Sequence, residues 1–171
     1  MSLRIFEPRY VRMIKQACAS DSGFVICMLN AKGDKTSNAH IFPLGTHCKV
    51  IDFDVLEDGL LGVTVEGIEC VSIKDVQTEF DDLRIGECEP AGKWECDIKV
   101  NELHPINLRL KEIFDRYPEV SSLYSTTRFE DPIWVINRWI ELLPVGAEQK
   151  QHFLNQSDYK KVLSYLSQLI E

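Results

Sequence analysis

The sequence lacks the short motifs by which nucleotide-binding and hydrolytic enzymes are most readily identified. Its 171 residues contain no G-x-S-x-G, no H-E-x-x-H and no complete phosphate-binding loop. Residues 33–36 (Gly-Asp-Lys-Thr) come closest to such a loop but lack the glycine directly before the lysine. The carboxylates of residues 52–58 are interpreted as solvated surface rather than as a catalytic pair. We therefore predict no catalytic residues, no cofactor, no ATP hydrolysis and no peptidase activity.

Long apolar runs and an excess of basic residues are also missing. No run approaches the roughly 20 apolar residues of a membrane-spanning helix, and Arg4, Glu7 and Arg9 interrupt any secretion signal. The 27 acidic and 19 basic residues give a net charge of −8, which repels a phosphate backbone. We expect a cytoplasmic protein that binds neither membranes nor nucleic acid.

The cysteines and histidines do not form a recognisable metal-binding pattern. None of the six cysteines, at positions 18, 27, 48, 70, 88 and 96, belongs to a C-x-x-C pair. The four histidines, at positions 40, 47, 104 and 152, are equally scattered. We predict no metal site, and we interpret the cysteines as reduced and mostly buried small apolar side chains.

The first hundred residues have the pattern of short strands, apart from one helix. That helix is predicted over residues 8–18, with Glu7 as its cap and Pro8 in its first turn. Strands are expected over residues 24–29, 47–56, 61–65, 68–76 and 83–89, with an extended, proline-containing stretch at residues 41–45. Alternating apolar residues on both sides of Asp58 and Gly59 indicate a hairpin. Short strands with frequent turns favour a small closed or half-closed β-barrel.

The remaining residues have helical spacing. Helices are predicted over residues 106–117, 132–143 and 147–154, and over a last segment that begins after Ser157. Asp131 is the expected cap of the second of these helices. The predicted fold class is α+β, with a barrel subdomain at residues 1–99 and a helical bundle at residues 100–171.

Several separate motifs resemble the N-terminal domain of Lon proteases, in the same order and over essentially the whole chain. Residues 3–10 (Leu-Arg-Ile-Phe-Glu-Pro-Arg-Tyr) resemble its opening, and residues 42–46 and 56–67 resemble its central part. Residues 131–135, together with Arg138, residues 141–144 and residues 150–151, resemble its helical part.

This resemblance implies a PUA-like β-barrel followed by a helical bundle, used to recognise protein substrates. In complete Lon proteases an ATPase and a Ser-Lys peptidase follow this domain, and the chain is too short to contain either. It resembles a stand-alone bacterial version of the domain, or a domain taken from a longer protein. The resemblance supplies no catalytic or ligand-contact residues.

Two functions are consistent with these observations. The first is a non-enzymatic module that binds unfolded or degron-bearing polypeptides and presents them to a protease or chaperone. The alternative is an RNA-binding module, because other PUA-like barrels hold RNA, although the acidic charge opposes it. Binding of denatured proteins, compared with binding of RNA, discriminates between the two.

Trp134 and Arg138 are the candidate partner-binding residues. On a helical wheel of residues 132–143, Trp134 lies among polar neighbours that include Arg138. An exposed aromatic beside an arginine is typical of interface hot spots. The alternative interpretation is that both side chains cover a neighbouring helix or the barrel.

Members of the Lon family usually have about twenty further residues before the Ile-Phe-Glu-Pro motif, which here begins at Ile5. The resemblance therefore implies that the first barrel strand is missing. A barrel without that strand would leave an unpaired edge, so we expect self-association through this edge. The alternative is that the helix over residues 8–18 covers the gap.

Overall fold

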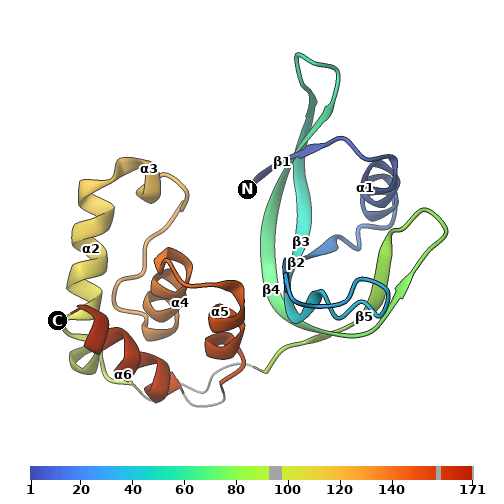
Figure 1. The fold of residues 1–171 in the computed structure, drawn as a ribbon. Helices are drawn as coiled ribbons and strands as arrows, with labels where there is room; N and C mark the ends of the chain where they lie inside the picture. Colours follow the sequence, from blue (N-terminus) through green and yellow to red (C-terminus); the bar gives the residue numbers. More distant parts are fainter. Residues whose placement is uncertain (93–97, 157–158, 171) are drawn as a thin grey trace. The chain divides into compact units, whose positions relative to one another are not determined.

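In a computed structural model the chain forms two compact units, Met1–Ala91 and Gly92–Glu171 (Figure 1). The structure describes residues 1–92, 98–156 and 159–170. The division between the units falls slightly earlier in the sequence than the expected boundary at residues 99 and 100. A sheet unit followed by a helical unit confirms the predicted α+β class.

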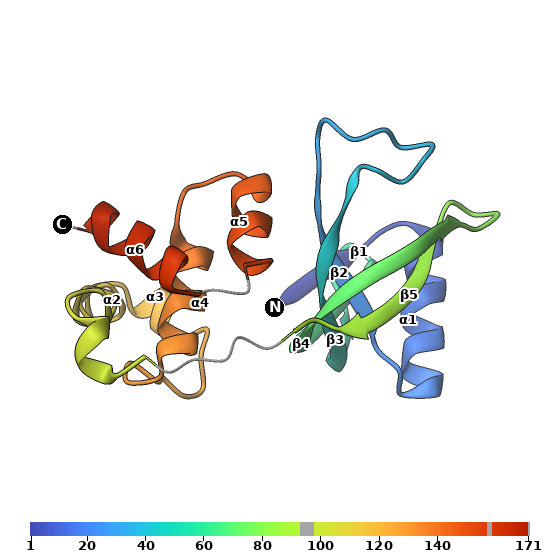
Figure 2. The ribbon, with the colours of Figure 1, turned by 90° about the horizontal axis from the view of Figure 1, so that it is seen from below.

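The first unit is built on an antiparallel sheet. Its strands are β1 (Ser2–Ile5), β2 (Phe24–Leu29), β3 (Ile41–Val55), β4 (Leu61–Thr78) and β5 (Arg84–Pro90). The order is β1-β4-β3-β2, and β5 also pairs with β4. Within the described residues β2 and β5 do not pair with each other, so the sheet curls but is not closed (Figure 2). Of the closed or half-closed barrel that the sequence predicts, the structure therefore has the form that is not closed.

The hairpin predicted around Asp58 and Gly59 is confirmed. Gly59 has a φ of 80°, and the Leu56 N–H donates to the Leu60 carbonyl oxygen across the turn, with an N···O distance of 2.8 Å. On each side of this turn, two elements that the sequence pattern separates form one long strand in the structure. Register shifts between β3 and β4, and a positive φ of 48° at Asp75, bend these strands without ending them.

Helix α1 (Pro8–Ser20) packs against the sheet and also confirms its prediction. Pro8 stands in its first turn, and Asp21 ends it with a left-handed φ of 51°. The Glu7 side chain does not cap the helix; its carboxylate pairs with Arg9 at 2.6 Å instead. Ile14 is buried beneath α1, in a cluster with the following residues of the sheet: Ile5, Cys48, Val63 and Val65.

The second unit consists of helices around one apolar core. The elements are η1 (Val100–Leu103), α2 (Ile106–Arg116), α3 (Pro118–Ser121), α4 (Pro132–Leu142), α5 (Ala147–Leu154) and α6 (Tyr159–Ile170). The Asp131 carboxylate accepts the N–H groups of Ile133 and Trp134 at 3.0 and 3.2 Å, which confirms it as the cap of α4. The predicted cap Ser157 lies outside the described residues.

The cysteines differ from the expectation of mostly buried side chains. Cys48 is buried and Cys27 is half-buried, whereas Cys18, Cys70 and Cys88 are exposed. The exposed thiols belong to α1, β4 and β5. All five are free, and Cys96 lies outside the described residues. No helix in the described part of the chain is long and apolar enough to span a membrane.

Candidate functional site

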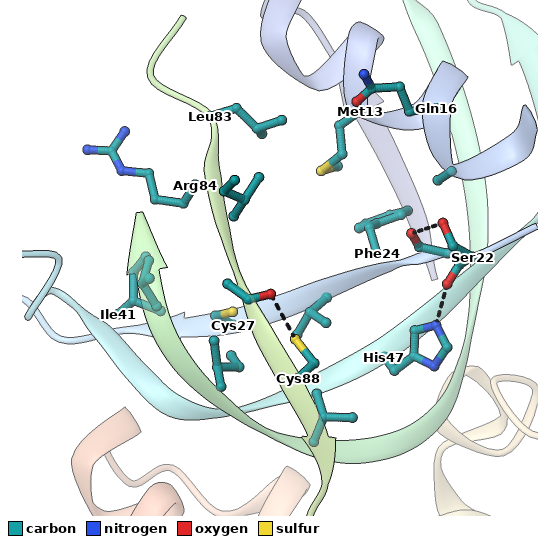
Figure 3. A pocket seen from close by; sticks show the side chains of 18 of the residues that line it. Met13, Gln16, Ser22, Phe24, Cys27, Ile41, His47, Leu83, Arg84 and Cys88 are labelled. Carbon is teal, nitrogen blue, oxygen red and sulfur yellow. Dashed lines mark hydrogen bonds between the residues drawn. The ribbon is translucent and has the colours of Figure 1, made fainter. Parts of the chain in front are cut away.

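The curled sheet and α1 enclose a cavity of about 530 Å³ in the first unit (Figure 3). This volume is within the usual range of ligand-binding pockets. Most of the lining side chains are apolar, and they come from α1, four strands and the segments between them. They include Met13, Phe24, Val25, Ile41, Val71, Ile73, Val76, Leu83 and Ile85.

Strand register explains why these side chains gather on one face. Cys27 pairs with Gly45, Gly45 with Val71, and Val71 with Pro90, so these residues form a row across the sheet. Directly paired residues point to the same face of a sheet. Gly45 has no side chain, and a Cβ at this position would lie 2.6 Å from Val25 and 3.1 Å from Ile73. A larger residue would therefore intrude on the face that the cavity occupies.

The two strands that border the cavity each have an unpaired edge. Among the described residues β2 pairs only with β3, and β5 pairs only with β4. Backbone N–H and C=O groups along such edges are free to pair with another extended chain. The site therefore combines an apolar concave surface with hydrogen-bonding groups that recognise a backbone.

Charged and polar side chains lie at the two ends of the cavity (Figure 3). At one end the His47 Nε2 atom lies 2.7 Å from the Ser22 carbonyl oxygen, and its Nδ1 lies 3.7 Å from Glu69. At the other end Arg84 donates from Nε to the Asn38 side chain at 3.2 Å. These polar groups already have partners within the protein. The other side chains that line the cavity are mostly apolar.

The Cys27 and Cys88 thiols both line the cavity. Burial raises the pKa of the Cys27 thiol to about 11, with a smaller contribution from the nearby Cys88. Burial also raises the pKa of Cys88. A raised pKa keeps these thiols protonated at neutral pH, so they act as small apolar groups rather than as nucleophiles.

The candidate residues Trp134 and Arg138 lie in the helical unit, within an aromatic cluster. The Trp134 ring is 5.3 Å from that of Phe129, 5.7 Å from that of Phe114 and 5.9 Å from that of Tyr124. Trp134 is half-buried and packs against the core of this unit. This packing is that of a side chain covering neighbouring helices, and the proposed role of both residues in partner binding stays a prediction.

Arg138 joins this cluster to an acidic side chain. Its guanidinium lies 4.7 Å from the centre of the Tyr124 ring and pairs with Glu141 at 3.0 Å. The Tyr124 hydroxyl donates to the same carboxylate at 2.7 Å. Burial, followed by this hydrogen bond, raises the pKa of Tyr124 to about 12. The hydroxyl is therefore a stable hydrogen-bond donor at neutral pH.

Sequence analysis identified none of the cavity residues as a site. In the sequence, Val71 alternates with Ile73, and Val25 alternates with Cys27. This alternation indicates strands, but only the pairing of the strands shows that the four side chains lie on the same face. In the described residues there is no group of three or more His, Cys, Asp or Glu side chains that could hold a metal ion. Asp52, Asp54, Glu57 and Asp58 are all exposed, as expected for surface carboxylates.

The fold is similar to those of two solved Lon N-terminal domains. A Lon N-terminal domain protein from Xanthomonas campestris is 23% identical with a TM-score of 0.70, and the match covers 97% of this chain and 86% of that one. The N-terminal domain of Mycobacterium avium complex Lon protease is 16% identical with a TM-score of 0.67, covering 97% and 87%. At these identities the similarity establishes the fold. No curated protein matches the chain.

The whole sequence matches one family model. The model describes the ATP-dependent protease La (LON) substrate-binding domain, and it matches residues 1–171. This match agrees with the motifs at both ends of the sequence and with the order of sheet and helices. The chain therefore belongs to the family of Lon substrate-binding domains.

Proposed function

We propose that this Lon-type substrate-recognition module holds extended apolar segments of unfolded or degron-bearing polypeptides in the cavity of its sheet unit. One observation carries the proposal: the apolar cavity lies between two strands, β2 and β5, whose outer edges are unpaired among the described residues. In the cell the module would present such segments to a protease or a chaperone.

The physical basis is recognition by strand addition. A segment that pairs with the edge of β2 or β5 forms main-chain hydrogen bonds, which do not depend on its sequence. Every second side chain of an added strand points to the same face, so alternate side chains would enter the cavity. Because folded proteins bury such apolar stretches, only unfolded or locally extended chains offer both features together.

The cavity can be tested with one apolar position on each face of the sheet. Ile85 lines the cavity and is 45% exposed, whereas Ile68 on β4 does not line it and is 49% exposed. We expect Ile85→Asp to weaken binding of fluorescent, reduced and alkylated α-lactalbumin by about tenfold, because it places a charge in the apolar site. Ile68→Asp, which adds the same charge, should change the Kd by no more than about twofold.

Fluorescence anisotropy gives the Kd, and circular dichroism verifies that both variants are folded. Native α-lactalbumin should bind far more weakly than the unfolded form. Equal effects of the two variants, or equal binding of native and unfolded protein, would contradict the proposal. A gel shift with single-stranded RNA in parallel tests the alternative function, which predicts binding of RNA and not of unfolded protein.

A further inference from the structure

The helical unit has a groove of about 720 Å³ between α2 and the residues that lead into α4. Helix α2 packs against α4, and residues 122–131 join α3 to α4 (Figure 1). Asn107, Leu108 and Lys111 of α2 line one wall, and residues 127–131 line the other. Positions three and four apart lie on the same face of a helix, so the α2 side chains project together. The groove therefore belongs to the helical unit alone.

The second wall is held in place by its own packing. The Phe129 ring lies 5.4 Å from that of Phe114 and 5.3 Å from that of Trp134, in edge-to-face contacts. The Asp131 N–H donates to the Arg128 carbonyl oxygen at 3.0 Å, and the Asp131 carboxylate caps α4. The fold therefore fixes the backbone from which Arg128 reaches the groove.

Asn107 brings a buried polar group to this groove. Its side chain is 6% exposed, and its Oδ1 atom accepts the Leu108 N–H at 2.9 Å. This bond leaves the Nδ2 group as a donor, and no hydrogen-bond partner of that group is found among the described residues. Buried polar groups in folded proteins almost always have a partner. The groove therefore contains a donor that requires an acceptor from outside the chain.

The surroundings of this donor favour negative charge. Lys111 and Arg128 line the groove, and no ion pair is found for either in the part of the chain that the structure describes. By contrast, Arg109 on the same helix pairs with Glu112 at 3.0 Å. Helix α2 has no acidic residue in its first turn, so the positive end of its dipole is not compensated there. An anion beside Asn107 would meet both cations and this helix end.

Two carboxylates also line the groove, and they differ in what they contact. The Asp131 carboxylate is already bound by the Ile133 and Trp134 N–H groups of α4. Glu130 is exposed and forms no ion pair within the described residues. Its charge offsets one of the two cations, so one positive charge remains for a ligand. Glu130 should therefore weaken the binding of an anion without preventing it.

Apolar side chains lie beside these donors and identify the occupant further. Leu108 is 51% exposed and Phe129 is half-buried, and both line the groove. A carboxylate satisfies an amide donor and cations, but inorganic phosphate or a lone carboxylate would leave the apolar side chains uncovered. The last residue of a polypeptide carries a carboxylate and a side chain on one carbon atom. An apolar C-terminal residue therefore matches both parts of the groove.

We propose that this groove binds the C-terminal residue of a polypeptide in which that residue is apolar. The Asn107 amide would donate to the terminal carboxylate, and Lys111 and Arg128 would neutralise its charge. Leu108 and Phe129 would contact the terminal side chain. The cavity of the sheet unit holds extended interior segments, so the groove is a second contact that does not depend on the cavity.

Three fluorescent peptides separate the parts of the ligand. Each consists of glycine and serine, and the first ends in two leucines with a free carboxylate. We expect the second, which has a C-terminal amide instead, to bind about tenfold more weakly, because it lacks the charged acceptor. The third keeps the carboxylate but ends in two serines, and it should bind several-fold more weakly. Fluorescence anisotropy measures each Kd.

Variants of the groove test the assigned donors. Asn107→Asp keeps an oxygen that can accept the Leu108 N–H but replaces the Nδ2 donor by a carboxylate oxygen, so binding of the leucine acid should fall at least tenfold. Lys111→Met should weaken it several-fold, whereas Lys161→Met, at an exposed lysine of α6, should leave the Kd within about twofold. Glu130→Gln should strengthen binding. Circular dichroism verifies the fold of each variant.

Three results would overturn the proposal. The first is equal binding of the leucine acid and its amide, and the second is an equal effect of Lys111→Met and Lys161→Met. The third is displacement of the peptide by inorganic phosphate as effectively as by unlabelled peptide, because the groove would then be a general anion site. Ile85→Asp should not alter binding of the leucine acid, so failure here is distinguishable from failure of the cavity proposal.

Discussion

The sheet unit and the helical unit bury their apolar side chains in different ways. In the described part of the helical unit, twelve buried residues of η1 and the helices form a single cluster together with Ile98. The corresponding cluster of the sheet unit has five buried members. Other apolar side chains of that unit line the cavity or lie exposed on the β3–β4 hairpin. The helical unit therefore has a closed core, whereas part of the apolar surface of the sheet unit stays accessible.

This difference follows from the geometry of the elements. Amphipathic helices can rotate and shift until their apolar stripes face one another. A sheet presents a fixed row of side chains on each face, and it encloses them only if its edges meet or another layer covers them. Here the edges of β2 and β5 do not pair and α1 covers only part of the face. The uncovered remainder is the surface that a binding protein requires.

The largest expected effect tests the closed core. Leu110 of α2 is 0% exposed, and Leu108 of the same helix is 51% exposed. We expect Leu110→Ala to lower the free energy of unfolding of the helical unit by about 3 kcal/mol, and Leu108→Ala by less than about 1 kcal/mol. Urea unfolding followed by tryptophan fluorescence measures this, since Trp134 and Trp139 both lie in α4. Similar losses for the two variants would show that the core is not closed.

A second variant tests whether Trp134 belongs to that core or to a binding surface. We expect Trp134→Ala to lower the free energy of unfolding by roughly 2 kcal/mol, less than for a fully buried tryptophan, because the ring is half-buried. Trp94 and Trp139 remain as the fluorescent reporters. Unchanged stability together with lost binding of unfolded α-lactalbumin would instead support the prediction that Trp134 and Arg138 contact a partner.

Sequence patterns predicted the features that local chemistry determines. Pro8, Asp131 and the Asp58-Gly59 turn act through their own backbone or their nearest neighbours, so they fixed the start of two helices and one hairpin. The openness of the sheet could not be predicted in the same way. It depends on whether β2 and β5 pair with each other. The sequence of a strand does not show whether its edge will find a partner strand.

The open cavity and the exposed apolar side chains of the β3–β4 hairpin were missed for a related reason. Alternation in Phe53 and Val55 indicates that both side chains share a face of a strand. It does not indicate whether anything covers that face, which depends on how far α1 extends over the sheet. Cys70 and Cys88 are exposed for a related reason, because the apolar or strand-like stretches around the cysteines do not show how far another layer covers the sheet.

A third prediction concerns the contact between α1 and the β4–β5 hairpin. Arg12 of α1 holds the β4–β5 hairpin through Glu79 and through Asp81, which its Nε atom approaches at 2.9 Å. We expect Arg12→Ala to lower the Tm of the sheet unit by a few degrees, and more than Arg4→Ala, whose side chain is more exposed. Calorimetry on the two variants measures the difference.

The same contact predicts a dependence on pH. The hydrogen bond from Arg12 lowers the pKa of Asp81 below its usual value. Such a group stabilises the fold above its unfolded pKa of about 3.9, and the stabilisation is lost as the pH falls through the folded value. The Tm difference between wild type and Arg12→Ala should thus be constant near neutral pH and shrink below about pH 4. A difference that grows in acid would contradict this assignment.

The smallest effect concerns the two exposed thiols of the sheet. Cys88 lines the cavity, whereas Cys70 precedes the cavity residue Val71 on β4 and so points to the opposite face. Burial raises the pKa of both thiols, so both should react slowly with iodoacetamide in the free protein. With unfolded, alkylated α-lactalbumin bound, we expect alkylation of Cys88 to slow several-fold and that of Cys70 to stay unchanged, as measured by mass spectrometry.

Cys27 provides an internal reference for this experiment. With a pKa of about 11, only about one side chain in a thousand is the reactive thiolate at pH 8. Its labelling should therefore lag behind that of the exposed Cys18 whether or not a polypeptide is bound. Protection of Cys70 equal to that of Cys88 would mean that the polypeptide covers both faces of the sheet, and the open cavity would then no longer distinguish this unit as the binding surface.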